Sequence, residues 1–396
     1  MLRVAYVFER FPSFGQTFCY REVAELERQG AEVTVFSIRR PTGEPRQDWN
    51  DDLVGRVRYL PDEPELVKEI DRAARSRQLP EQACRALRDW DRQTDFLRLY
   101  QAAHIGLQLR KQGIERVHAH FAGMAARTAY WINQFFGIGF SVTAHANDIF
   151  APRNFAVGLT KIFDAATAVV TVSDFAVARL QEQFPQDHAK IHRVYNGVHV
   201  ADFAPADFNS SPPLIVSIGR LIEKKGFADL VEVCRLLREQ GTEFRCEIIG
   251  DGPLEAALVA QIAAVQLSDR VRLSGPRAQS EIAGRLRAAN VFSLPCTREA
   301  DGGMDNLPTV IMEAMAAGVP VVSTAVAGVP EMVVHNVTGE LVAPGDIPAL
   351  AAAIARLISD RRLAATYGEN GRARAAEKFS IENNVRALSS VLQQRA

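Results

Sequence analysis

The chain has 396 residues, a formal net charge of −1 and 47 % hydrophobic residues, a composition typical of a globular protein long enough for two domains. A net charge near zero gives no support to nucleic-acid binding, which requires a strongly basic face. The five cysteines are scattered without a Cys-x-x-Cys pair and predict reduced thiols rather than a disulfide framework or a zinc site. The first residues already form a strand pattern, and no apolar run reaches membrane-spanning length. We therefore expect a cytoplasmic protein whose only contact with a membrane would be peripheral.

The N-terminal 40 residues predict a strand at 4–8, a loop, a helix at 19–30 and a second strand at 32–37. This order opens a parallel sheet covered by helices. The loop lacks Gly-x-Gly-x-x-Gly, so a dinucleotide-dependent dehydrogenase is disfavoured. Taken alone, the loop fits a surface turn as well as it fits a ligand contact.

Residues 40–116 combine a segment rich in Pro and Asp with helices in which basic and acidic residues are interleaved. Solvated helix faces with local ion pairs are the simpler interpretation. The alternative is a basic amphipathic surface that rests on anionic lipid. The arginines concerned are Arg72, Arg75, Arg77, Arg85, Arg88, Arg92, Arg98 and Arg110.

Two histidine-bearing loops follow the next predicted strands. His120 ends one strand, and His145 and Asp148 follow another. Loops at the carboxyl ends of parallel strands converge on one crevice, so these side chains are expected to face the same space as Gly15. A structural role for the histidines and a functional one are equally good interpretations.

The alternation of strands and helices restarts at residue 214, after a segment rich in Asp, Asn, Ser and Pro. The predicted boundaries are 1–197 for the first domain, 198–213 for a linker and 214–378 for the second domain, with a break near Phe379. Arg220 and Lys225 lie in the first strand-to-helix loop of the second domain, where two cations beside a helix start can neutralise a diphosphate. The later Gly250-Asp-Gly252 segment is a weak signal that suits close backbone approach to a nucleotide.

The most informative stretch is residues 299–320, an acidic loop followed by an apolar helix. Pro308 fits the first helical position and Gly318 the stop. Glu313 interrupts the apolar helix, and a buried carboxylate requires a partner. Because helical side chains lean toward the N-terminus, Glu313 is expected to point at the helix end that Asp305 surrounds. Two carboxylates beside an anion-binding helix end predict a pocket for a ligand with both hydroxyl and phosphate groups.

The segment from Asp305 to Glu313 resembles the paired-carboxylate motif of retaining glycosyltransferases of family 4, in which seven residues separate two Glu residues. The resemblance covers nearly the whole chain. It implies an α/β protein of the GT-B fold, with two Rossmann-like domains facing a cleft and a C-terminal helix, 379–396, that packs on the first domain. Residues 11–18, Phe-Pro-Ser-Phe-Gly-Gln-Thr-Phe, are similar to a loop of the branch that builds bacterial exopolysaccharides such as colanic acid. Three positions depart from the family pattern, namely Gly15, Gln16 and the shortened Asp305.

The resemblance also implies roles for individual residues. Glu313 would hold the ribose, Asp305 the donor sugar, and Arg220 with Lys225 the diphosphate. The implied catalytic residues are His120, His145 and Asp305, and Thr17 and Asp148 belong to the acceptor side. The implied donor contacts are Gly15, Gln16, Arg220, Lys225, Gly250, Gly252, Arg277, Asn306, Leu307, Pro308, Thr309 and Glu313.

The implied reaction moves a hexose, with retention, from a nucleotide-diphosphate sugar to a glycan or polyprenyl-linked acceptor. A UDP-sugar is favoured and GDP-mannose is the second choice. No Asp-x-Asp occurs near the predicted diphosphate anchors, so no metal and no other cofactor is expected. A non-catalytic nucleotide-sugar-binding protein of the same fold is the alternative, because Gly15, Gln16 and Asp305 depart from the pattern. A phosphorylase that uses pyridoxal phosphate has no signal in the sequence.

Overall fold

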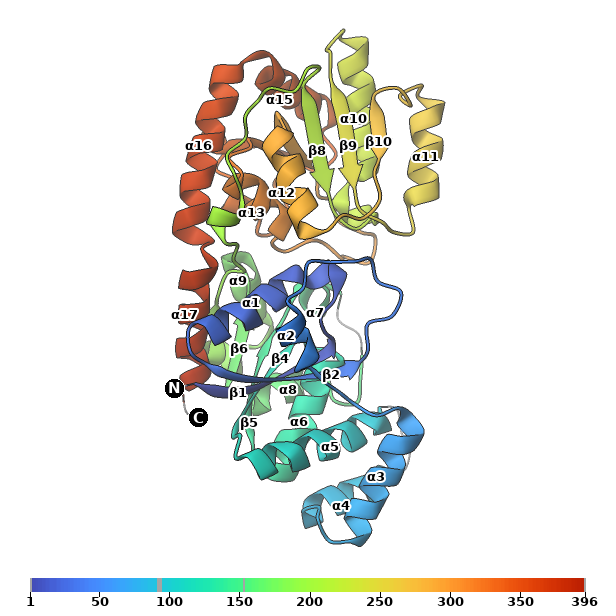
Figure 1. Cartoon of the computed structure of the whole chain (residues 1–396), viewed down its shortest axis with the longest axis vertical. Helices are drawn as coiled ribbons and strands as arrows, with labels where there is room; N and C mark the ends of the chain where they lie inside the picture. Colours follow the sequence, from blue (N-terminus) through green and yellow to red (C-terminus); the bar gives the residue numbers. More distant parts are fainter. Residues whose placement is uncertain (1, 91–94, 152–153, 395–396) are drawn as a thin grey trace.

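The computed structural model describes residues 2–90, 95–151 and 154–394. Two α/β domains are stacked along its long axis (Figure 1). The first contains a seven-stranded sheet in the order β3-β2-β1-β4-β5-β6-β7, and the second a six-stranded sheet in the order β10-β9-β8-β11-β12-β13. All pairings within both sheets are parallel. The predicted pair of parallel-sheet domains is confirmed.

The first domain places its sheet between helices. Its strand β1 is buried on both faces, with Ala5, Tyr6 and Val7 fully inaccessible, as expected for a parallel sheet covered on both sides. Its strands are β1 (Arg3–Arg10), β2 (Glu32–Arg39), β3 (Arg58–Tyr59), β4 (Arg116–His120), β5 (Gly139–Thr143), β6 (Ala168–Thr171) and β7 (Ile191–Arg193). Its helices are α1 (Thr17–Arg28), α2 (Asp51–Gly55), α3 (Glu63–Arg75), α4 (Glu81–Asp89), α5 (Phe96–Gln112), α6 (Met124–Phe136), α7 (Ala146–Phe150), α8 (Leu159–Ala165) and α9 (Asp174–Gln183).

The second domain repeats this architecture. Its strands are β8 (Leu214–Ile218), β9 (Arg245–Ile249), β10 (Val271–Leu273), β11 (Val291–Leu294), β12 (Val321–Thr324) and β13 (Gly339–Val342). Its helices are α10 (Phe227–Glu239), α11 (Glu255–Ala264), α12 (Gln279–Ala288), α13 (Thr309–Ala316), α14 (Val329–Met332), α15 (Ile347–Ser359) and α16 (Arg361–Lys378). The helix predicted after Pro308 is confirmed as α13, with Pro308 at its N-cap and Gly318 just beyond its end.

The last helix, α17 (Ile381–Gln393), returns to the first domain. It lies beside that domain in Figure 1, and Val385 and Leu388 share an apolar cluster with Tyr6 of β1 and Leu26 of α1. The chain therefore crosses between the domains a second time, after α16.

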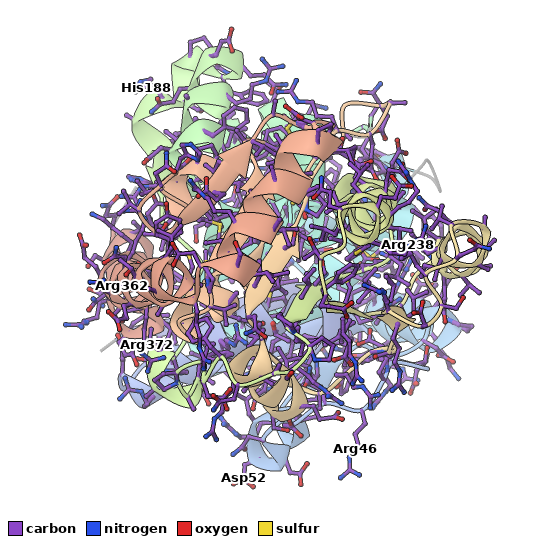
Figure 2. The ribbon with its side chains drawn as sticks, turned by 90° about the horizontal axis from the view of Figure 1, so that it is seen from above. Arg46, Asp52, His188, Arg238, Arg362 and Arg372 are labelled. Atoms are coloured by element: carbon purple, nitrogen blue, oxygen red, sulfur yellow. The ribbon has the colours of Figure 1, made fainter. Side chains whose placement is uncertain are left out.

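Arg372 of α16, labelled in Figure 2, ties this crossing to the linker and to α13. Its guanidinium donates a hydrogen bond of 2.7 Å to the carbonyl oxygen of Phe203 in the linker, and it also donates to the carbonyl oxygen of Ala316. Since Ala316 is the last residue of α13, this contact satisfies one carbonyl that the helix end leaves free.

The helices α3 and α4 project from the end of the first domain that is remote from the second (Figure 1). Most of the predicted basic surface is exposed there, but Arg98 is buried and retains only 6 % exposure. Burial lowers the pKa of Arg98 to about 10, so this residue belongs to the core and the prediction that placed it on the surface is wrong. Arg92 lies outside the described residues. No helix in the described parts of the chain combines the length and apolarity needed to span a bilayer.

Candidate active site

Two adjoining cavities lie between the domains. The larger has a volume of about 550 Å³ and the smaller about 260 Å³. Gly15, Gln16, Lys225 and Thr309 line both cavities, so the two form a continuous space. A cavity of about 760 Å³ lies elsewhere, against the outer strands of the second sheet. None of the predicted site residues lines this third cavity, so its size does not make it the site.

The wall shared by the two cavities carries positive charge. It is formed by Gly15 and Gln16 of the first domain, by Lys225 of the loop after β8 and by the first residue of α13, Thr309. Arg220 is exposed on the larger cavity. The ammonium of Lys225 lies 2.5 Å from a carboxylate oxygen of Asp305, and each side chain is 14 % exposed. Burial lowers the pKa of Lys225, but the charge and hydrogen bond of Asp305 together with Cys296 outweigh it, and the pKa is raised overall.

The two predicted carboxylates lie in different cavities. Asp305 lines the smaller cavity and Glu313 the larger. Glu313 is not left without a partner, because Arg21 of α1 donates to its Oε1 at 2.7 Å. The side chains of Arg21 and Glu313 are 11 % and 4 % exposed. The pair joins the two domains, and the sequence contains no local sign of it because its members are 292 residues apart.

The loop after β11 supplies the polar lining of the smaller cavity. Asn306, Leu307 and Pro308 line that cavity together with Thr309. The side chain of Asn306 accepts a hydrogen bond of 2.5 Å from Ser173 of the first domain. Within the described residues its Nδ2 is buried without a partner.

The two glycines after β9 have different tasks. Gly250 lines the larger cavity, and a Cβ there would lie 1.9 Å from the carbonyl oxygen of Gly219. Gly252 is absent from the described walls of both cavities. A Cβ at Gly252 would lie 2.6 Å from the carbonyl oxygen of Leu221. The lack of a side chain at Gly252 allows the loops after β8 and β9 to pack, and its predicted ligand contact stays a prediction.

The two histidines lie one behind the other at the smaller cavity. His145 lines it, with its ring between Phe18 at 5.0 Å and Phe121 at 4.4 Å. His120 is completely buried behind His145, and its Nδ1 lies 3.1 Å from Nε2 of His145. His120 therefore does not reach the cavity surface in this structure, and its predicted catalytic role stays a prediction.

The two predicted acceptor-side residues also take other positions. Asp148 accepts a hydrogen bond of 2.9 Å from the backbone N–H of His145 and stabilises the start of α7. Burial raises its pKa to about 6, and in the described chain it lines neither cavity. Thr17 lines the larger cavity, as does Arg277. Thr17 therefore belongs to the same cavity as Glu313 and not to the one lined by Asp305.

Two further contacts close the site from the first domain. The segment between β2 and α2 lines the larger cavity and reaches the second domain, where Gln47 and Asp48 accept hydrogen bonds of 2.6 and 3.0 Å from the first N–H groups of α12. Lys224 donates to Asn147 at 2.7 Å across the smaller cavity. The composition of the segment that holds Gln47 gives no sign of its contact with α12, because that helix lies more than 200 residues away in the sequence.

Comparison with known proteins places this architecture. Residues 15–202 match the family model described as Glycosyltransferase Family 4, and residues 201–374 match the model described as Glycosyl transferases group 1. The chain is 30 % identical over 425 residues to an Escherichia coli K12 protein named as the colanic acid biosynthesis glycosyltransferase WcaL, covering 99 % of this chain and all of that protein. It is 42 % identical over 185 residues to the amylovoran biosynthesis glycosyltransferase AmsK of Erwinia amylovora, covering 47 % of this chain and 46 % of the other.

A solved structure shows the same fold. The Anabaena protein Alr3699/HepE, in complex with UDP-glucose, is similar with a TM-score of 0.75 at 18 % identity, covering 99 % of both chains. The predicted GT-B arrangement of two Rossmann-like domains is confirmed.

Proposed function

Since the chain belongs to the group 1 and family 4 glycosyltransferases, we propose that it transfers a hexose from a nucleotide-diphosphate sugar to a growing bacterial exopolysaccharide. The finer parts of the proposal are retention at the anomeric carbon, independence of metal, preference for a UDP-sugar and a glycan or lipid-linked oligosaccharide as acceptor.

One observation carries the proposal, the pair of cavities that meet at Lys225 and the start of α13. A nucleotide in the larger cavity would place its ribose near Glu313 and its diphosphate against Arg220, Lys225 and the free N–H groups of the helix. The sugar would then enter the smaller cavity, beside Asp305, Asn306 and His145. This separation supports the division of roles between the two carboxylates.

The chemistry of such a site is electrostatic. When the bond between sugar and diphosphate breaks, negative charge grows on the leaving phosphate oxygen, and preorganised cations stabilise that charge without reorganising. Lys225 is already held at this place by Asp305. Asp305 can then pass from the ammonium to the sugar hydroxyls as Lys225 turns to the phosphate. The acceptor hydroxyl would attack from the same face that the diphosphate leaves and pass its proton to the leaving phosphate oxygen, which retains the configuration.

The relatives support the donor and acceptor classes. HepE was crystallised with UDP-glucose, and UDP is the nucleotide that we propose for this chain. WcaL and AmsK are named for two exopolysaccharides, which favours a glycan acceptor. The family resemblance implies a glycan or polyprenyl-linked acceptor. The exposed arginines of α3 and α4 offer a surface that could meet anionic lipid.

Calorimetric titration with UDP and GDP, followed by NMR of UDP-glucose hydrolysis, tests the proposal. We expect UDP to bind more tightly than GDP in the presence of EDTA. We also expect slow hydrolysis to release the α-anomer of glucose first. Release of the β-anomer first would contradict retention, and tighter binding of GDP would reassign the donor.

One observation favours a second candidate, a non-catalytic protein that binds nucleotide sugars. The ion pair between Asp305 and Lys225 occupies both groups within the site, and a shortened carboxylate reaches less far toward a sugar. Binding of UDP-glucose without hydrolysis, and without transfer to any glycan fraction of the source cells, would favour this function.

A further inference from the structure

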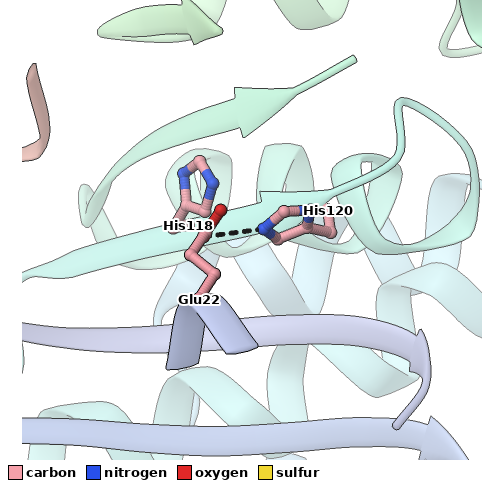
Figure 3. A group of neighbouring side chains, drawn as sticks. All are labelled: Glu22, His118 and His120. Carbon is pink, nitrogen blue, oxygen red and sulfur yellow. Dashed lines mark hydrogen bonds and ion pairs between the residues drawn. The ribbon is translucent and has the colours of Figure 1, made fainter. Parts of the chain in front are cut away.

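A line of buried polar side chains runs from α1 to the wall of the smaller cavity. Tyr6 of β1 donates to Oε1 of Glu22 at 2.7 Å, and the same oxygen lies 2.9 Å from Nε2 of His120. The other ring nitrogen of His120 lies 3.1 Å from Nε2 of His145. Figure 3 shows Glu22 reaching from α1 to His120 on β4, with His118 beside it.

The same group has the spacing of a metal site. Ligand atoms of Glu22, His118 and His120 all lie within 4.8 Å of one another. The nitrogens of His118, however, are occupied by Ser141 Oγ at 2.8 Å and Thr143 Oγ1 at 2.9 Å. Both nitrogens of His120 are occupied as well. A metal would have to break these bonds, so the geometry favours a hydrogen-bonded chain.

A hydrogen-bonded chain of polar side chains is costly to bury unless every side chain in it is paired. His120 has no exposed surface and its ring is stacked on Phe8 at 5.2 Å. An apolar side chain would fill this place without any polar partner. The polar chain ends at His145, the one of its four members that lines either of the two described cavities.

We propose that Glu22 is a positioning residue of the transfer reaction, which acts through His120 to fix the ring of His145 at the wall of the sugar cavity. This inference rests on the proposed function. Glu22 itself is absent from the described walls of both cavities, so any effect on turnover must pass through the histidines.

The charges along the chain give His145 a defined proton arrangement. Burial by itself lowers the pKa of His120, but Cys19 and Glu22 outweigh it and raise the pKa to about 10. Burial, and after it the charge of His120, lowers the pKa of His145 well below its ordinary value. A charged His120 donates to both neighbours, so His145 accepts at Nε2 and carries its proton on Nδ1. The titratable groups that face His120 are Tyr6, Cys19, Glu22, His118 and His145.

The test compares Glu22→Gln with His118→Gln. Glutamine keeps the shape of Glu22 but removes the charge. His118 is as buried as His120 and lies on the same strand, but it bonds to Ser141 and Thr143 rather than to His145. Its variant therefore controls for a general disturbance of the core. Three quantities are measured for each protein: UDP affinity, the rate of UDP-glucose hydrolysis across pH, and the ¹⁵N shifts of the His145 ring.

For Glu22→Gln we expect UDP affinity within twofold of the wild type and kcat at least tenfold lower. The His145 ring signals should report a changed tautomer. The loss of a negative charge lowers the pKa of His120, so the alkaline limb of the kcat profile should move to lower pH. His118→Gln should keep the His145 signals and kcat within threefold. A merely structural Glu22 would change UDP affinity and the circular dichroism spectrum along with kcat, leaving the His145 tautomer as it was.

The outcomes separate the two levels of inference. A wild type that binds neither UDP nor GDP and hydrolyses no nucleotide sugar contradicts the proposed function, while the ring shifts still decide whether Glu22 positions His145. An active wild type with unchanged kcat and ring shifts in Glu22→Gln overturns the positioning role. Elemental analysis that finds one metal ion per chain in the wild type, lost in Glu22→Gln, overturns it in favour of a metal site.

Discussion

Replacement of Lys225 by alanine is expected to weaken the binding of UDP strongly. The side chain has two roles at the wall shared by the cavities. It would donate to the diphosphate, and it neutralises the carboxylate of Asp305 at 2.5 Å. Lys225→Ala therefore removes one cation and leaves one anion beside the ligand.

The two effects have separate magnitudes. A lost charge-assisted hydrogen bond costs about 1.5–3 kcal/mol. The unpaired carboxylate of Asp305 would add a repulsion of about 2 kcal/mol, if it and the diphosphate are taken as unit charges about 8 Å apart in an effective dielectric of about 20. The dissociation constant should therefore rise by a factor of about 10³, since each 1.4 kcal/mol corresponds to a factor of ten. Arg220 is exposed and neutralises no carboxylate in the described site, so Arg220→Ala should show only the first effect, about 1.5–3 kcal/mol.

A double-mutant cycle with Asp305→Asn isolates the repulsion. Calorimetry of UDP binding in EDTA is the assay. Asp305→Asn alone should bind UDP at least as tightly as the wild type, because Lys225 is released to the phosphate, while sugar transfer falls. The double variant should recover about 2 kcal/mol of the loss seen in Lys225→Ala. Unchanged affinity in Lys225→Ala, or a double variant as weak as the single one, would refute the reasoning.

Three further predictions follow from the same structure. Arg21→Met leaves the buried carboxylate of Glu313 without its partner and should destabilise the protein by about 3–5 kcal/mol, measured as a lower denaturation midpoint; adding Glu313→Gln should restore most of it, and strictly additive losses would argue against the pair. Chelation with EDTA should leave the rate of sugar transfer almost unchanged, since cationic side chains serve the diphosphate; a loss that magnesium or manganese reverses would show the opposite. Flotation should detect binding to anionic but not neutral vesicles at low salt, weakly because each basic residue contributes only about 1 kcal/mol. That binding should disappear when exposed arginines of α3 and α4 are changed to serine (Arg72, Arg75, Arg85 and Arg88), and indifference of the wild type to anionic vesicles would remove the lipid-linked acceptor from the proposal.

Local patterns in the sequence were sufficient for the architecture and for one wall of the site. Strands and helices alternate, and strands such as β6 and β12 are short apolar runs, so two parallel sheets follow from this order of elements. The helix α13 was predicted to within a residue, because Pro308 and Gly318 are local signals of its start and end. Loops after parallel strands converge on one edge, which explains why the loops that carry Arg220, Lys225 and Asp305 lie at one site.

The partners of these residues depended on the tertiary structure. Arg21 meets Glu313, Ser173 meets Asn306, and the Gln47 segment meets α12 only because the two domains face each other. The sequence separations are between 133 and 292 residues, and no periodicity relates positions so far apart.

The histidines show the same limit within a single domain. Periodicity predicted that His120 and His145 end neighbouring strands, but a strand residue may point into the core or toward the cleft. The packing of α1 against β4 decided this, because it buries His120 against Glu22 and leaves His145 on the cavity wall. Sequence therefore determined which residues reach this edge of the sheet, and the packing of distant elements determined which of them a ligand can touch.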